Sequence, residues 1–452
     1  MLALLALGAC SGDGGGGGFV GAAASSGTGT LSVKLTDAPA GAGLARVYVT
    51  IERIGVLRAG ADPRSGWSEI VLDPPRKIDL LGLRNGVTVG LGDLQLATGS
   101  YARLRLVLGR GPADHTIVLS SAPGAEIAMG MPANLRDGLE LPHPFHIGAG
   151  ETVELTLDFD AARSVVLSDS APGILPSEPA PQGSAAAGSA MAPAPGPVVD
   201  SGVRRVSKPV VVGSSDVSKA DPLALLKPSI AVIPTVSDGL PASGAVTGAF
   251  DDDSADGATV SLQTLDLSTG AVVVKRSTVV ERRRWVLDPV PPGRDYRLVV
   301  ARAGYRTVVL TGVDVAAGAT IGPVALGALE AATTLRAASG RIVPADPAAG
   351  KDARVRALQR VDAGAGAAGA VVVEVASTMT PLDTGAFTLT LPVDAARVAR
   401  FTAGPLAYTS GAGAGSYTLH ADGLDAATGG GVLAFDASGV GQSAGLEITT
   451  RR

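Results

Sequence analysis

One cysteine and three aromatic residues offer the most direct chemistry in this sequence. Cys10 is the single cysteine among 452 residues, so no internal disulfide can form. Cys10 instead follows an apolar run and the small residues Gly8-Ala9, a pattern typical of the end of a secretory signal. Trp285, Tyr296 and Tyr305 have flat rings that could stack on a sugar. The three aromatic positions are therefore the candidate stacking surfaces for a glycan, should the chain bind one.

Two histidines and two aspartates have the residue types of a metal site. His143 and His146 supply nitrogens, and Asp158 and Asp160 supply oxygens. A zinc site needs ligands that converge, but Pro144 opposes a helix between the histidines. The alternation of apolar residues predicts that both aspartates lie on a solvent face. A solvated turn is therefore predicted, and no metal ligand is assigned.

The acidic loop Asp251–Gly257 suggests calcium as an alternative to a plain turn. Aligned with a twelve-residue calcium loop, it matches the early ligand positions. Gln263, however, stands where a bidentate glutamate is needed, and no helices flank the loop. We predict a hairpin loop held by aspartate hydrogen bonds, with calcium as the alternative.

No group of residues predicts catalysis. The sequence has neither a Gly-x-Ser-x-Gly elbow nor a Gly-x4-Gly-Lys phosphate loop. Asp37, which precedes Ala38-Pro39, is explained by a carboxylate that accepts backbone N–H groups at a turn. The run Arg282–Arg284 is explained as charge protecting an edge strand, with an anionic glycan or lipid head group as the alternative. The chain is predicted to be no enzyme and to need no cofactor.

Short β-strands are the elements expected to position these residues. Beyond residue 29 the apolar residues recur with a period of two, as at Leu31, Val33 and Leu35. The phase slips between Ile51 and Ile54, which predicts a β-bulge. The fold class is predicted as all-β, with tandem antiparallel β-sandwich domains of Greek-key or prealbumin type after a lipidated flexible N-terminus.

Changes of composition divide the chain. Residues 168–222 are rich in Pro, Ala and Ser, and are predicted to be a disordered linker. Leu223–Lys227 is the best short helical candidate, although Pro228 ends it or makes it a strand. The predicted parts are a partial signal peptide (1–9), a glycine-rich tether (10–28), a β-sandwich with the linker inserted (29–236), a second β-sandwich (242–330) and a third, diverged one (337–452).

A glycine turn followed by a tyrosine occurs once in each predicted sandwich. The three instances are Gly99-Ser100-Tyr101, Gly293-Arg294-Asp295-Tyr296 and Gly415-Ser416-Tyr417, each expected shortly before a late strand. Glycine permits the turn, and we expect each tyrosine to bury its ring while its hydroxyl reaches a backbone partner.

Several spaced motifs in the first sandwich resemble one family of bacterial lipoprotein domains. Leu31–Pro39, Val47–Ile51, Gly99–Leu106 and Leu157–Ser164 are similar to the domain of unknown function 4382. Leu226–Ile230 loosely matches the Leu-Lys-Pro closing strand of that family. The resemblance implies that the linker is inserted before the last strand of this domain, which costs little because loop-closure entropy grows slowly with length.

The second sandwich resembles the carboxypeptidase regulatory-like module, a prealbumin-type member of the carbohydrate-binding-like fold group. Gly244-Ala245-Val246, Pro291–Tyr296 and Gly304-Tyr305 carry the resemblance, and residues 337–452 look like a diverged copy. The resemblance implies non-catalytic sandwiches and confers no known ligand.

The segment Leu7–Cys10 resembles the bacterial lipobox, in which the cysteine is acylated after cleavage of the signal. No Lys or Arg precedes the apolar run, so we expect the natural start to lie upstream of Met1. Ser11, in place of aspartate, favours the outer membrane by the family's sorting rule. Several acyl chains together make a stable anchor.

Composition and motifs together define the predicted role. The chain has 37 basic and 42 acidic residues, with a net charge of −5, which excludes a strongly basic nucleic-acid binder. We predict a bacterial cell-envelope lipoprotein, anchored in the outer membrane with its domains on the periplasmic face or the cell surface. Its predicted partners are the membrane, through the lipid, and a glycan or an envelope protein. A carbohydrate-binding surface protein is the alternative, and a hydrolase of envelope polymers is the third hypothesis.

Overall fold

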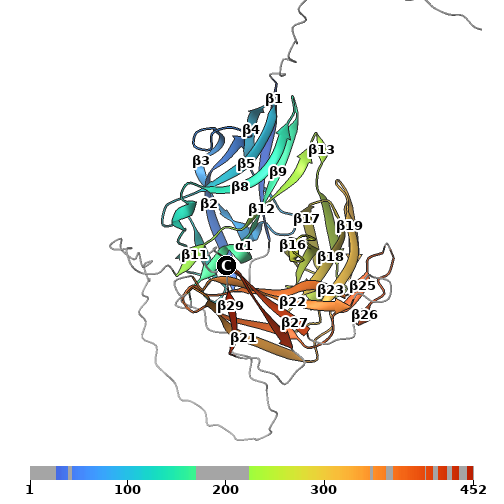
Figure 1. Cartoon of the computed structure of the whole chain (residues 1–452). Helices are drawn as coiled ribbons and strands as arrows, with labels where there is room; N and C mark the ends of the chain where they lie inside the picture. The colour runs from blue at the N-terminus through green and yellow to red at the C-terminus, as the bar shows by residue number, and fades with distance from the viewer. Residues whose placement is uncertain are drawn as a thin grey trace, which may run out of the picture.

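The fold is derived from a computed structural model of the chain (Figure 1). Cys10 and residues 169–222 of the predicted linker lie outside the described residues. Within the described part nearly every element is a strand, so the predicted all-β class is confirmed. The structure describes residues 27–38, 43–168, 223–346, 350–362, 370–402, 404–410, 416–424, 430–436 and 445–450.

Buried apolar residues form three clusters, and each cluster with the sheets around it is called a unit below. The first unit holds residues 27–241, the second begins at residue 242, and the third begins near residue 335. In Figure 1 the first unit forms the upper part of the molecule, the second lies beside its lower half on the right, and the third lies at the bottom. The chain enters at the end of the first unit that points away from the third.

The first unit is a sandwich of two sheets, with strand orders β13-β12-β9-β1-β4 and β7-β6-β2-β5-β8, and β3 paired to β2. Leu31, Val33 and Leu35 of β1 point into its core, as their alternation predicted. Its elements are β1 (Thr28–Ala38), β2 (Leu44–Arg58), β3 (Trp67–Asp79), η1 (Leu80–Gly82), β4 (Val89–Ala97), β5 (Gly99–Leu108), β6 (Thr116–Leu119), β7 (Glu126–Ala128), η2 (Ala133–Leu135), β8 (Leu139–Ile147), β9 (Thr152–Asp160), α1 (Ala161–Ser164), β10 (Val165–Leu167), β11 (Ala224–Leu226), β12 (Ile230–Ser237) and β13 (Leu240–Pro241).

One local prediction is confirmed in this unit. The ladders of β2 with β3 and with β5 both shift between Ile51 and Arg53, where the phase slip predicted a bulge. The strand β12 pairs with β9, and β13 pairs with β12 at the edge of the first sheet. The predicted insertion of the linker before a closing strand stays a prediction. Leu223–Lys227 forms the strand β11 rather than a helix, because its backbone completes a ladder with β10.

The second and third units share one topology. In the second unit a three-stranded sheet, β17-β14-β20, accompanies a longer sheet that contains β16-β15-β18-β19. In the third unit the corresponding sheets are β24-β21-β29 and β23-β22-β27-β28. The first and last strands of each unit pair in parallel. The period-two pattern did not predict this, because alternation carries no information about the direction of a neighbouring strand.

The elements of these two units are as follows. The second unit contains β14 (Gly244–Ala249), η3 (Asp253–Ala255), β15 (Thr259–Leu265), β16 (Val272–Val279), β17 (Arg284–Val290), β18 (Gly293–Ala301), β19 (Val308–Val315) and β20 (Thr320–Ala325). The third contains β21 (Leu335–Pro344), β22 (Ala353–Asp362), β23 (Ala370–Met379), β24 (Ala386–Pro392), β27 (Ser416–Gly423), β28 (Gly430–Asp436) and β29 (Leu446–Thr450).

Two strands from the range predicted for the third sandwich join the sheet of the second. The strand β25 (Arg397–Arg400) pairs in parallel with β19, and β26 (Thr409–Ser410) pairs with β25. Ala399 is buried in the second core. The described strands of residues 337–452 therefore lie in three sheets, one of which belongs to the second unit. A shared backbone ladder thus joins the lower two units.

The three recurring tyrosines occupy equivalent environments, as predicted. Tyr101, Tyr296 and Tyr417 are 4 %, 4 % and 3 % exposed. Their hydroxyls donate to backbone oxygens at 2.9, 3.0 and 2.6 Å, and the acceptors are Ala97, Pro291 and Pro392. Each ring fills its core while the hydroxyl satisfies a carbonyl of the same unit.

Replacing Tyr296 by phenylalanine tests this role. Tyr296→Phe should lower the free energy of unfolding of the second unit by about 1 kcal/mol, because the Pro291 carbonyl loses its donor. Urea unfolding followed by the fluorescence of Trp285 measures the change, in a Trp67→Phe background that removes the other tryptophan. Tyr305→Phe is the control, since no hydrogen bond of its hydroxyl is found among the described residues. Equal midpoints for the two variants would contradict the assigned role.

Candidate functional site at the junction of the three units

An arginine of the second unit is buried against the first unit. Arg276 of β16 is 2 % exposed, and its Nη1 pairs with the carboxylate of Asp158 on β9. Its Nη2 donates to Thr36 Oγ1 at 2.9 Å and to the Asp288 backbone oxygen at 3.2 Å. A buried charge is tolerated when it is paired and hydrogen-bonded, so this contact fixes how the two units meet.

Asp158 was predicted to face solvent, and this prediction is wrong. Its side chain does leave the core of the first unit, but the residue is only 7 % exposed. The second unit covers that face of β9, so strand alternation alone could not reveal its burial. Arg276 was not singled out from the sequence. It shares one face of β16 with Thr278, and the ladder with β15 shifts between Val274 and Arg276.

A tight turn of the first unit docks beside this ion pair. Asn85 has a positive φ of 56°, a conformation that asparagine tolerates. Its Oδ1 accepts from Thr278 Oγ1 at 2.8 Å and from Val286 N at 3.4 Å. At Gly86, whose φ is 78°, an added Cβ would lie 3.2 Å from Val286. The turn thus fits closely against the second unit.

The third unit contacts both of the others. Lys227, just after β11, pairs with Asp352, and Leu382 N donates to Leu167 O at 3.0 Å. Towards the second unit, Gln263 accepts from Glu374 N at 2.9 Å and donates to Glu374 O at 2.8 Å. A buried side-chain amide thus bonds to the backbone of the facing unit, which fixes the two sheets relative to each other.

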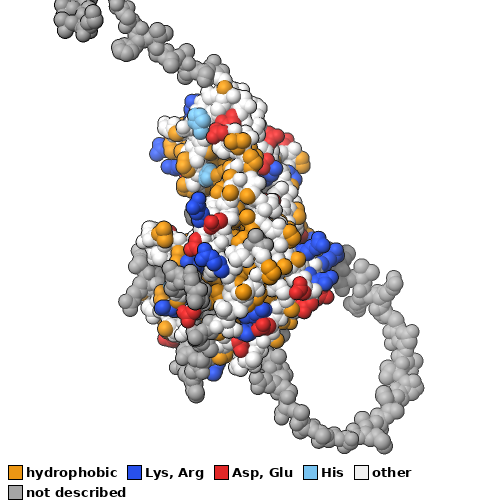
Figure 2. Space-filling model, turned by 90° about the vertical axis from the view of Figure 1, so that its right-hand side faces the viewer, with side chains coloured by type: hydrophobic (Ala, Val, Ile, Leu, Met, Phe, Trp, Pro, Cys, Tyr) orange, Lys and Arg blue, Asp and Glu red, His pale blue; other side chains and the backbone are white. Residues whose placement is uncertain are grey.

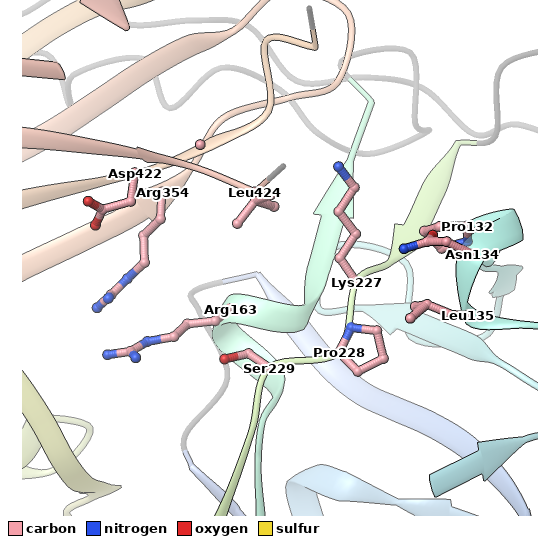
Figure 3. A pocket seen from close by; sticks show the side chains of 11 residues that line it. Pro132, Asn134, Leu135, Arg163, Lys227, Pro228, Ser229, Arg354, Asp422 and Leu424 are labelled. Carbon is pink, nitrogen blue, oxygen red and sulfur yellow. The ribbon is translucent and has the colours of Figure 1, made fainter. Parts of the chain in front are cut away.

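A cavity of about 590 Å³ lies between the first and third units (Figure 3). Arg163, Lys227 and Arg354 line it. Burial lowers the pKa of Arg354 to about 10; Glu374 raises that pKa, and the like charge of Arg163 lowers it further. A smaller cavity of about 350 Å³, bordered by residues of all three units, shares Arg163 and Arg354.

The predicted aromatic platform is not present as one surface. Trp285 and Tyr296 are 1 % and 4 % exposed, so the prediction that they stack on a glycan is wrong. The indole of Trp285 lies against Gly248, where a side chain would collide with it, and fills the core. Tyr305 is half-buried and lines the smaller cavity, with the Arg302 guanidinium 4.8 Å from its ring centre. Cys10 lies outside the described residues.

The acidic loop and the arginine run contact each other. Asp256 Oδ1 accepts from Arg283 N at 2.7 Å, and Arg283 Nε lies 3.3 Å from Asp253. Asp252 Oδ1 accepts from Ser254 N at 2.9 Å, so the loop is held by aspartate hydrogen bonds as predicted. Among the described residues, no group of three or more His, Cys, Asp or Glu side chains is arranged to hold a metal ion.

Asp37 accepts a backbone N–H group, as predicted, but the donor lies at the start of α1 and not in the turn that follows Asp37. Its Oδ1 accepts from Ala161 N at 3.0 Å, and the residue is 1 % exposed. Its Oδ2 has no hydrogen-bond partner among the described residues. Burial raises the pKa of Asp37 well above its usual range; Asp160 and Asp158 raise it further, while the Ala161 N–H and Arg276 lower it.

The surface carries charges of both signs. On the face shown in Figure 2, Lys and Arg side chains lie beside Asp and Glu side chains, with hydrophobic side chains between them. Some of these opposite charges form exposed ion pairs, such as Arg103 with Glu140 at 2.9 Å. This face presents no extended basic patch.

Comparison with known proteins relates part of the first unit to a family. Residues 28–175 match the family described as "Domain of unknown function (DUF4382)", which confirms the predicted resemblance for these residues. A search of curated proteins gives no match to the chain. The carboxypeptidase regulatory-like resemblance of residues 242–330 stays a prediction.

Solved structures show only distant similarity. The Bacillus anthracis TIE protein has a TM-score of 0.14 and 10 % identity, and the match covers 93 % of this chain and 57 % of that protein. The minor pilin GBS52 of Streptococcus agalactiae has a TM-score of 0.14 and 11 % identity over 46 % of this chain and 97 % of its own. A putative adhesin from Bacteroides ovatus has a TM-score of 0.15 and 12 % identity over 46 % and 93 %. Scores of this size do not establish a shared fold.

Removing the buried arginine tests the junction between the first two units. Arg276→Met should lower the free energy of unfolding by about 3–5 kcal/mol, because Asp158 is left as an unpaired buried charge. The double variant Arg276→Met with Asp158→Leu should recover most of this loss, since an apolar pair carries no uncompensated charge. Urea unfolding measures both, and Arg103→Gln at an exposed ion pair is the control. A double variant as unstable as the single one would contradict the explanation.

The raised pKa of Asp37 predicts an unusual pH dependence. The unfolded state releases this proton near pH 4, before the folded state does, so stability falls as the pH rises from there through the raised pKa. Asp37→Asn should remove that fall and be at least as stable as the original protein at pH 7, because its amide oxygen still accepts from Ala161 N. Asp37→Ala should be less stable at every pH. Thermal unfolding between pH 4 and pH 8 measures the effect, and an unchanged pH dependence in Asp37→Asn would refute it.

Proposed function

We propose that this chain is a lipid-anchored, non-catalytic protein of the bacterial cell envelope that presents three β units as one rigid array. The observation that carries the proposal is the set of buried polar contacts between units, of which the Arg276–Asp158 pair is the deepest. Such contacts hold tandem domains in one arrangement, whereas domains joined by short linkers alone move relative to each other.

The direction of the chain supports an anchor at the N-terminal end. The described chain begins at the end of the first unit that faces away from the third (Figure 1). A lipid on Cys10 and the glycine-rich residues after it would span roughly 25 Å, as a flexible coil of that length does. No helix among the described residues is long and apolar enough to cross a bilayer. The third unit would then lie farthest from the membrane.

The acidic side chains that could take part in chemistry make structural contacts, which supports a non-catalytic role. Asp37 caps a turn, Asp158 pairs with Arg276, and the acidic loop binds Arg283. Each of these groups already serves a structural contact. The alternative is carbohydrate binding through the second unit. Trp285 and Tyr296 are buried and cannot serve as stacking surfaces for it, whereas Tyr305 is half-buried and remains a candidate.

Cell fractionation tests the anchor. The protein should partition with membranes when expressed in its natural host, and Cys10→Ser should move it to the soluble fraction, because the acylated side chain is lost. Ser11→Asp is the matched variant: it keeps the lipid but should shift the protein from the outer to the inner membrane on a sucrose gradient. Membrane association that persists in Cys10→Ser after a high-salt wash would overturn the anchor.

A further inference from the structure

The cavity between the first and third units has a cationic side and apolar walls. Arg163 comes from the short helix α1 of the first unit, and Arg354 comes from β22 of the third. Figure 3 shows their guanidinium groups on the same side of the cavity, and Leu135, Pro228 and Leu424 also line it. A cavity with apolar walls and a few convergent polar groups is typical of a small-molecule site.

Both arginines keep donors that their own ion pairs do not use. Arg163 binds Asp160 through Nε at 2.8 Å. Arg354 binds Glu374 and Ser377 through Nη2. Among the described residues, no hydrogen bond involves the Nη groups of Arg163 or Nη1 of Arg354. Guanidinium groups with unused parallel donors match the two oxygens of a carboxylate or phosphate.

The charge that faces the cavity is positive. Arg163, Lys227 and Arg354 line it, whereas the carboxylates that pair with them do not. Asp422 also lines it, but this carboxylate lies 2.7 Å from Arg356 Nε. Burial lowers the pKa of Arg354, and the like charge of Arg163 lowers that pKa further, because both disfavour the cation. A bound anion would relieve that repulsion.

We propose that this cavity binds a small organic anion. Arg163 and Arg354 hold its carboxylate or phosphate group, and its less polar part packs on Leu135, Pro228 and Leu424. A volume of about 590 Å³ suits a ligand of one or two sugar rings or an acid of similar size. The site rests on the proposed binding role of the array, and it gives that role a location and a ligand class.

Calorimetric titration of the full chain tests the site. The probes are glucuronate as the carboxylate, glucose 6-phosphate as the phosphate, and glucose as the neutral control. Saturable binding of either anion, without binding of glucose, is the expected result, and the anion that binds more tightly identifies the group. Anion binding in this titration does not depend on the lipid. Fractionation therefore tests the anchor, and calorimetry tests the cavity, independently of each other.

Two variants and one control locate the binding. Arg163→Gln should weaken binding about tenfold, the loss expected for one hydrogen bond to a charged group. Asn134→Asp, at an exposed wall residue, should weaken it by repulsion and leaves the ion pairs of the junction untouched. Arg103→Gln removes the same charge at a remote exposed pair and should change affinity less than twofold. No saturable binding of either anion, equal binding of glucose, or equal weakening by Arg103→Gln would overturn the proposal.

Discussion

The buried ion pair between Arg276 and Asp158 is the contact on which the arrangement of the first two units depends. Both side chains are almost fully removed from water, and a charge in that position is tolerated only with its partner in place. The pair therefore selects one orientation of β16 against β9. Thr36 and the Asn85-Gly86 turn add hydrogen bonds and close packing that only this orientation allows.

The third unit is held differently, mainly through its backbone. The strand β25 continues the sheet of the second unit, and Gln263 bonds to the backbone of Glu374. Three rounded sandwiches fixed in this way leave space where they meet. The two cavities occupy that space, and the arginines they share come from different units. The candidate ligand site is thus a product of the assembly of units rather than of any one of them.

Features determined by neighbours in sequence were predicted well. The period of two predicted the strands, and its slip predicted the bulge after Ile51. The glycine turns predicted three tyrosines with buried rings and bonded hydroxyls. The spaced motifs predicted the family matched by residues 28–175. Each signal acts over a few residues, so composition and spacing are enough to detect it.

The amino-acid sequence alone was thus sufficient for the all-β class, the strand pattern and the family resemblance of residues 28–175, because backbone preference, alternation and short motifs are local. The alternation of apolar residues assigned the side chains of each strand to a core face and an outer face. It did not show whether another unit covers the outer face. Only the tertiary structure showed that the second unit covers Asp158, and that Trp285 lies within a core. Only the tertiary structure also showed that β25 pairs with a strand of the second unit, and that Arg163 and Arg354 line one cavity. These outcomes depend on how whole sheets pack, and burial, which decides the role of each such side chain, is a property of that packing.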